Sequence, residues 1–236
     1  MKKYLNCEET NIAMPDPEIL SIFSSLSRVG FFNSSVLIGT WAMFIYRVVY
    51  GFEYVLRTGD IDIAIQVSLY DKNKKLKTDI RQLLIDHGAT VEDSNDGSLE
   101  KIITHNYYIE FISGARSRLG KPLFVREWNV TAQRLDFINM LLDFSIRLET
   151  DYFYIRIPTP EAFFLHKLIV ANKRPDKSKR LKDLEQCSLL VDIVDGVMLK
   201  KVVSSQVFSP KTRSKIKSSC EMIDFPYDRI DQCYTS

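Results

Sequence analysis

The stretch Thr58-Gly59-Asp60-Ile61-Asp62-Ile63 decides the fold of this chain, because it combines the pattern of a half-buried strand with two acidic side chains. In a β-strand, residues two positions apart point to the same face. Asp60 and Asp62 would therefore project two carboxylates side by side, while Ile61 and Ile63 enter the core. Adjacent carboxylates repel each other unless a cation lies between them. Mg²⁺ meets that need, since it takes one or two protein carboxylates and completes its shell with water and phosphate oxygens.

Glu110 is the candidate for a third acidic ligand. It lies in Tyr108-Ile109-Glu110-Phe111-Ile112, a segment that is otherwise mostly apolar and predicts a further strand. Three carboxylates would hold two metal ions about 3.5–4 Å apart, the arrangement that serves in-line phosphoryl transfer. Taken alone, Glu110 is also typical of an exposed edge residue, and the Asp60–Asp62 pair alone is weak evidence for a metal.

A glycine turn lies upstream of the acidic strand. Leu37-Ile38-Gly39-Thr40 places a glycine and a hydroxyl between a predicted strand at 36–38 and a predicted helix that begins at Trp41. Backbone N–H groups at a helix N-terminus, with no side chain at Gly39 in the way, suit a triphosphate. The alternative is a plain glycine turn in which Thr40 caps the helix. Both can hold at once, because the capping turn would present the amides.

The other periodic segments predict an α/β front part and a mostly helical back part. The expected elements are a helix opened by residues 15–18, a strand at 61–65, a helix at 76–87 closed by Gly88, strands at 102–103 and 107–112 joined by a hairpin, and a strand at 152–157. Pro158-Thr159-Pro160-Glu161 then opens a helical region that extends to about residue 217. The junction of the two parts is expected between Leu148 and Pro160.

Composition describes an ordinary globular chain. The 236 residues are 45% apolar and 26% charged, and the formal net charge of +2 creates no global field that would demand a nucleic acid. Positive charge gathers at 167–182 and 211–217, where a phosphate-bearing partner and a solvated helix face are the alternatives. The four cysteines form no CxxC pair, so we expect free thiols in a reducing cytoplasm. The first residues lack the apolar core of a signal peptide, and no stretch approaches the roughly 18 apolar residues of a membrane span.

Taken in order, Ile38-Gly39-Thr40, Asp60-Ile61-Asp62 and Glu110 resemble the motif pattern of the polymerase β nucleotidyltransferase superfamily. That pattern is a hydrophobic residue, Gly-Gly or Gly-Ser, a spacer, an acid-hydrophobic-acid strand and a later strand with a third acid. Three downstream segments are similar to a bacterial branch of uncharacterised nucleotidyltransferases: 132–142, 158–169 and 182–186. The resemblance therefore runs from about Val36 to Val191.

The resemblance implies an α+β fold in two domains. Residues 1–150 would form a nucleotidyltransferase core with a small mixed β-sheet and helices on one side, and residues 151–236 a mostly helical C-terminal domain. Asp60, Asp62 and Glu110 would be the catalytic residues and would bind Mg²⁺ or Mn²⁺. Gly39 and Thr40 would contact the nucleotide phosphates.

Toxin-like relatives carry a lysine helix followed by a basic-aspartate motif. Lys167 and Lys182-Asp183 are similar to that motif, with Arg174 between them. The resemblance therefore implies that Lys167, Arg174 and Lys182 also bind the nucleotide. Lys167 is equally typical of a lysine on an amphipathic helix that faces solvent.

The implied reaction is transfer of a nucleoside monophosphate from an NTP to a hydroxyl group, with release of pyrophosphate. The acceptor stays open between RNA, a protein side chain and a small molecule, and an antitoxin-type partner is expected if the chain is a toxin. A different class of function is a catalytically degenerate module that binds nucleic acid or a protein partner. That alternative is favoured by Thr40 where Gly or Ser is usual and by Glu110 where aspartate is usual.

Overall fold

The computed structural model describes residues 16–67, 75–93, 100–114 and 121–234. The chain forms two compact units, Met1–Ile157 and Pro158–Ser236. The sequence-based boundary at 150 and 151 would separate β8 (Ser145–Glu149) from β9 (Tyr154–Pro158), which pair with each other in a two-stranded sheet. Pro15 and Cys7 lie outside the described residues. Across the described part of the chain, no helix has the length and apolar character needed to cross a bilayer.

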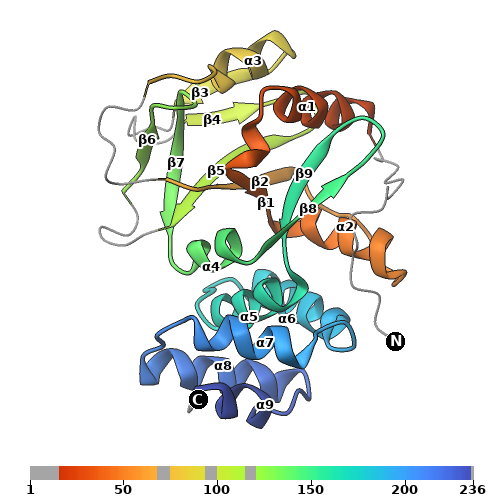
Figure 1. The fold of residues 1–236 in the computed structure, drawn as a ribbon, viewed down its shortest axis with the longest axis vertical. Helices are drawn as coiled ribbons and strands as arrows, with labels where there is room; N and C mark the ends of the chain where they lie inside the picture. Colours follow the sequence, from red (N-terminus) through yellow and green to blue (C-terminus); the bar gives the residue numbers. More distant parts are fainter. Residues whose placement is uncertain (1–15, 68–74, 94–99, 115–120, 235–236) are drawn as a thin grey trace. The chain divides into compact units, whose positions relative to one another are not determined.

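The first unit is built on a mixed seven-stranded sheet, which confirms the expected core (Figure 1). Its main path runs β1-β2-β5-β4-β3, and β7 pairs with β5 and with β6. Strand β2 is parallel to β5, and β5 is parallel to β7, whereas the remaining pairs are antiparallel. The strand bounds are β1 Ser35–Leu37, β2 Asp60–Ile65, β3 Thr90–Asp93, β4 Glu100–Ile103, β5 Tyr108–Gly114, β6 Leu123–Val125 and β7 Val130–Leu135.

One face of this sheet, here called the inner face, carries the apolar residues of the acidic strand. Ile61 and Ile63 are fully buried there. Phe111 of β5 meets Phe31 edge-to-face at 5.9 Å, and Phe31 belongs to the short 3-10 helix η1 (Phe31–Asn33). The alternation of β2 therefore separates core side chains from the carboxylates, as the sequence predicted.

Helix α1 forms where the sequence signals place it, and α2 begins at Gly39, two residues earlier than predicted. Helix α1 (Pro17–Arg28) starts after Asp16, whose carboxylate accepts a hydrogen bond from the Glu18 N–H at 2.8 Å. Helix α2 (Gly39–Tyr50) follows β1 directly. Phe23 of α1 packs edge-to-face on Trp41 of α2 at 6.0 Å. The first unit thus ties the two helices together through aromatic side chains.

Helix α3 (Ile80–Asp86) is shorter than the helix predicted at 76–87. Asp79 caps it by accepting from the Gln82 N–H at 2.8 Å. The N–H groups of Lys77 and Ile80 donate to the carbonyls of Glu127 and Trp128 at 2.9 and 3.0 Å, so the preceding residues are held against the β6–β7 turn instead of continuing the helix. Gly88 follows the helix with a positive φ of 87°, as expected for its C-terminal end.

Helix α4 (Ile138–Asp143) lies on the opposite face of the sheet, here called the outer face. Gly114 ends β5, and a Cβ added to it would overlap the Asn139 side chain of α4. Because Gly114 is three residues after the inner-face Phe111, it points outward. The expectation of helices on one side only is therefore wrong, since α4 covers part of the second face.

The second unit is helical throughout, as predicted. Its α-helices are α5 Pro160–Ala171, α6 Lys177–Leu190, α7 Gly196–Ser204, α8 Pro210–Met222 and α9 Asp228–Asp231. Thr159 caps α5, with its hydroxyl accepting from the Ala162 N–H at 3.3 Å. Almost every residue of α5 is buried, because α6, α7 and α8 all pack against it. Helix α5 is therefore the core of this unit.

Candidate active site

The three predicted acidic residues lie side by side on the outer face of the sheet. The parallel register of β2 and β5 sets Asp62 directly beside Glu110, and Asp60 beside Tyr108. Asp60 and Glu110 are exposed, and Asp62 is partly buried. Neighbouring strands lie about 4.8 Å apart, so the register sets these three residues close together on one face, and they are called here the carboxylate row (Asp60, Asp62 and Glu110).

Backbone contacts hold the carboxylate row in place. The indole Nε1 of Trp41 donates to the Asp60 carbonyl at 3.1 Å, and the Asp60 N–H donates to the Thr58 hydroxyl at 3.1 Å. The Ile38 N–H donates to the Asp62 carbonyl at 2.9 Å. The glycine turn and the acidic strand are thus joined by hydrogen bonds, which fixes the start of α2 next to Asp62.

Gly39 touches the row itself. Its φ is +65°, and a Cβ added there would overlap Oδ2 of Asp62 and lie 3.1 Å from its Cγ. Only glycine combines this backbone conformation with such a close approach. The first N–H groups of a helix have no intrahelical acceptor, so the turn brings the start of α2, with its backbone donors, next to the Asp62 carboxylate.

Thr40 does not cap α2. The N-cap position is Ile38, which has no side-chain cap, and Thr40 lies within the first turn with 7% of its surface exposed. The predicted capping role of Thr40 is therefore wrong. Its predicted contact with nucleotide phosphate would have to come from its backbone N–H.

The donor chemistry of the carboxylate row suits a hard divalent cation such as Mg²⁺, because all the ligands are carboxylate oxygens. Among the described residues, no group of three or more His, Cys, Asp or Glu side chains is already gathered closely enough to hold a metal ion. The row is an open ledge of adjacent carboxylates. Such a ledge fits an ion that keeps several water and phosphate ligands of its own.

The second unit brings two of the predicted nucleotide-binding residues to one carboxylate. Lys167 Nζ lies 2.5 Å from Asp183 Oδ1, and Arg174 Nε lies 3.1 Å from Asp183 Oδ2. Lys167 is 8% exposed and Asp183 is 3% exposed. The alternative of a solvent-facing Lys167 is therefore wrong. These three residues are called here the buried ion cluster; Lys182 precedes Asp183 on α6 and is partly buried.

Helix α5 carries two further polar groups: His166, for which a structural role was the expectation, and Glu161, whose burial was not predicted from the sequence. Burial and the charge of Lys167 lower the pKa of His166 to about 3, so the imidazole is neutral near pH 7. Glu161 is buried and accepts from the Asp195 N–H at 2.8 Å, next to the start of α7. Burial raises the pKa of Glu161, and that hydrogen bond opposes the rise. A helix this buried was the available signal, because every polar residue on it must find a partner.

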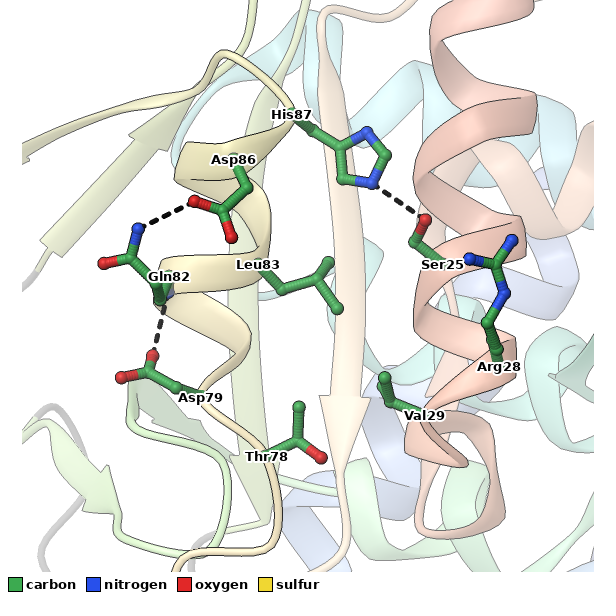
Figure 2. A pocket seen from close by; sticks show the side chains of 9 residues that line it. All are labelled: Ser25, Arg28, Val29, Thr78, Asp79, Gln82, Leu83, Asp86 and His87. Carbon is green, nitrogen blue, oxygen red and sulfur yellow. Dashed lines mark hydrogen bonds between the residues drawn. The ribbon is translucent and has the colours of Figure 1, made fainter.

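A polar hollow of about 420 Å³ lies between α1 and α3 in the first unit (Figure 2). His87 Nε2 and the Ser25 hydroxyl are 2.8 Å apart across it, and Gln82 Nε2 donates to Asp86 at 2.8 Å along α3. Both side-chain pairs are visible in Figure 2. None of the predicted site residues lines this hollow, and its polar groups bond within α3 or, through His87, to α1.

Several solved structures are distantly similar to this chain. A nucleotidyltransferase-like antigenic protein from Paracoccidioides brasiliensis is 12% identical, covers 87% of each chain and has a TM-score of 0.47. The antibiotic-resistance factor ANT(2'')-Ia is 10% identical over 92% of this chain and 90% of its own, with a TM-score of 0.37. A tRNA-processing enzyme is 12% identical over 96% of this chain and 60% of its own, with a TM-score of 0.29. A search of curated proteins finds no significant match.

The family assignment comes from the sequence itself. A nucleotidyltransferase family model matches residues 18–202, which is more than half of the 236 residues. The matched range includes the glycine turn, the carboxylate row and the buried ion cluster. The chain belongs to this nucleotidyltransferase family.

Proposed function

We propose that this nucleotidyltransferase moves a nucleoside monophosphate from an NTP to a hydroxyl of an acceptor and releases pyrophosphate. The observation that carries the proposal is the parallel register that sets Asp62 beside Glu110, with Gly39 packed against the Asp62 carboxylate. This arrangement combines a cation-binding ledge with the start of a helix. Both are required to hold a triphosphate for attack at its α-phosphorus.

Asp60, Asp62 and Glu110 are proposed to hold Mg²⁺ or Mn²⁺. Bound divalent ions supply a counter-charge for the triphosphate and favour ionisation of the attacking hydroxyl. The carboxylates would keep the nucleotide in one position, since catalysis of phosphoryl transfer rests mostly on positioning and charge neutralisation.

The glycine turn and Glu110 are proposed to act at opposite sides of the α-phosphate. Backbone N–H groups of Gly39 and Thr40 would donate to the phosphate oxygens of the leaving pyrophosphate. Glu110 lies on the side of Asp62 that faces away from β1, where it would complete the cation site or accept the hydroxyl proton. The acceptor oxygen forms a bond to the α-phosphorus, and the bond from that phosphorus to the bridging oxygen breaks.

Lys167, Arg174 and Lys182 are proposed to contribute to binding of the nucleotide phosphates, directly or by positioning one another. The Arg174 side chain is 43% exposed and uses Nε for Asp183. A guanidinium has further N–H donors, which would be available to phosphate. Lys167, which is enclosed with Asp183, would act mainly by fixing the position of that carboxylate and so of Arg174.

We also place the reaction in the cytoplasm. The described cysteines Cys187, Cys220 and Cys233 are free thiols, which fits a reducing compartment. A partner of the antitoxin type would bind this chain and suppress the transfer. Co-purification with the product of an adjacent gene, with loss of activity in the complex, would support that partner.

The test is isothermal titration of the four NTPs with and without Mg²⁺ on wild type and on Asp60→Asn/Asp62→Asn. We expect binding that depends on Mg²⁺ and is lost in the double variant. Asp151→Asn is the matched control, because Asp151 is an exposed acid of the same unit in the turn between β8 and β9. NTP binding that is independent of Mg²⁺ and unchanged in the double variant would replace the enzyme by the degenerate binding module.

A further inference from the structure

The outer face of the sheet is covered at one end and open at the other. Towards the carboxyl ends of β2 and β5, Ala64 and Ile112 are buried, and Asn139 of α4 lies against Gly114. Towards the start of the same strands, Asp60 and Glu110 are exposed. The open end therefore begins at the carboxylate row, among the residues that the structure describes.

Two exposed aromatic side chains lie on this open end. Tyr108 is 47% exposed and precedes Glu110 by two residues, so both point outward. Its ring lies over Gly59, since a Cβ on Gly59 would meet Tyr108 Cδ2 at 4.0 Å. One flat ring therefore stands beside Asp60, about 7 Å along β5 from Glu110.

The second ring is Phe124 of β6, which is 53% exposed. Phe124 pairs with Thr131 of β7, and the next β7 residue, Ala132, pairs with Phe111 of β5. Thr131 and Phe124 therefore continue the line of Glu110 across the outer face. At about 4.8 Å per strand, Phe124 lies about 10 Å from Glu110. Strands β5, β7 and β6 can be followed in Figure 1.

Basic residues flank the strand that carries the second ring. Lys121 lies two residues before β6, Arg126 follows it directly, and both are exposed. A single exposed aromatic is ordinary on a protein surface. Two exposed rings at the edge of a carboxylate row, one of them on a strand with an exposed cation before and after it in the chain, form instead a stacking surface with phosphate-binding charge near it. That combination is typical of single-stranded nucleic-acid binding.

We infer that the acceptor is the 3′ end of a single-stranded nucleic acid, with its last bases stacked on Tyr108 and Phe124. This inference rests on the proposed transfer at the carboxylate row. The glycine turn holds the triphosphate at the β1 side of Asp62, so the acceptor must approach from the β5 side. The terminal 3′-hydroxyl attacks the α-phosphorus, pyrophosphate leaves, and the hydroxyl proton passes to the Glu110 carboxylate or to solvent. Lys121 and Arg126 bind the backbone phosphates.

Fluorescence anisotropy with a labelled single-stranded RNA of about 12 nucleotides tests the surface without any turnover, within the site size of such proteins. We expect Phe124→Ala and Tyr108→Ala each to weaken binding about 10-fold, which is the size expected for loss of one base–aromatic stack. Tyr108→Phe should bind as wild type does, because it keeps the ring. Tyr152→Ala is the matched control, since Tyr152 is a 69% exposed aromatic in the β8–β9 turn of the same unit.

A transfer assay with labelled NTP then compares single-stranded RNA, single-stranded DNA and duplex as acceptors. Label should appear on one or both single strands, and Phe124→Ala should raise the KM for the strand while leaving MgNTP affinity unchanged. The inference is overturned if Phe124→Ala/Tyr108→Ala binds RNA as wild type does, if duplex is preferred, or if label goes to a protein. Loss of Mg²⁺-dependent NTP binding from wild type would refute the proposed function separately, since the anisotropy titration contains no nucleotide.

Discussion

Two groups of charged residues in this molecule differ in the sign of their neighbours and in their exposure to solvent. The carboxylate row places acids of one sign next to each other on an open sheet face, with Asp62 beside Glu110. The buried ion cluster places Lys167 and Arg174 on the two oxygens of Asp183, in the interior of a helical unit. The row gathers carboxylates on an open sheet face, whereas the cluster sets two cations against one buried carboxylate.

From this difference we expect the carboxylate row to bind a ligand and the buried ion cluster to affect stability. Like charges side by side raise the energy of the protein until a cation arrives, so they are poised for a ligand. A compensated pair out of water contributes little net stability, but removal of one partner leaves the other charge buried and unpaired. Substitutions of Asp60 and Asp62 should therefore lower activity while stability is kept, whereas loss of the buried Asp183 should lower stability first, whatever its effect on nucleotide binding.

The largest effect is expected from Asp60→Asn/Asp62→Asn. Transfer of labelled NMP should fall by at least about 10³-fold, because charge stabilisation at the reacting phosphate is the main source of the rate. The melting temperature should stay level or rise, since two repelling charges are removed. Asp151→Asn should keep wild-type turnover. A double variant that unfolds, or one that keeps full turnover, would contradict the assignment.

The next effect falls on stability. Asp183→Ala should lower the free energy of unfolding by about 3–5 kcal/mol, because it leaves Lys167 charged in a buried place. Urea denaturation of Asp183→Ala and of the exposed Asp192→Ala measures the difference. Adding Lys167→Met to Asp183→Ala should recover part of the loss. If Lys167→Met lowers stability further in that background, the two side chains do not act as a compensated pair.

The sequence predicted the row better than the cluster, for a physical reason. The alternation of Asp60 and Asp62 with isoleucines belongs to one strand, so a local pattern is enough to predict it. Glu110 lies beside Asp62 because two strands far apart in the chain pair with each other. A local pattern does not predict that pairing, and the resemblance to the nucleotidyltransferase motif pattern pointed to Glu110 as the third acid. The first residue of a helix is harder to predict from the sequence. Helix α3 starts later than predicted because the N–H groups of Lys77 and Ile80 donate to carbonyls of the β6–β7 turn.

Burial is the property that the local pattern concealed. Lys167 fits a solvent-facing helix position by sequence, and only the packing of three helices around α5 encloses it with Asp183. Thr40 likewise fits an N-cap by type, whereas the tight approach of Gly39 to Asp62 shifts the start of α2 to Gly39. Both depend on contacts between segments far apart in the chain.

A smaller effect on stability and NTP binding is expected at the glycine turn. It tests whether the contact between Gly39 and Asp62 contributes to nucleotide binding. Gly39→Ala should cost about 1–3 kcal/mol of stability and weaken Mg²⁺-dependent NTP binding, since the new methyl meets a strained backbone and displaces the Asp62 carboxylate. Gly51→Ala is the matched control at the other end of α2. Its φ is +76°, but an added Cβ has nothing within 4 Å. Equal NTP affinity in the two variants would show that the contact with Asp62 has no part in binding.

The smallest effect concerns pH and the cluster. The pKa of His166 is about 3 in the folded chain, against about 6.5 when unfolded. The unfolded state therefore takes up a proton first, so the stability from neutral His166 is complete above pH 6.5 and is lost as the pH falls towards 3. The loss approaches about 1.4 kcal/mol per pH unit for one proton.

His166→Gln should flatten the fall in unfolding free energy between pH 6.5 and 4.5 relative to wild type, measured by urea denaturation at each pH. His105→Gln, at an exposed turn position, reports what loss of any histidine does to the curve. If His166→Gln keeps the wild-type slope, His166 takes up its proton equally in the folded and unfolded states. The interior around Lys167 and Asp183 would then admit a further positive charge, and the contrast between the buried cluster and the open carboxylate row would lose its basis.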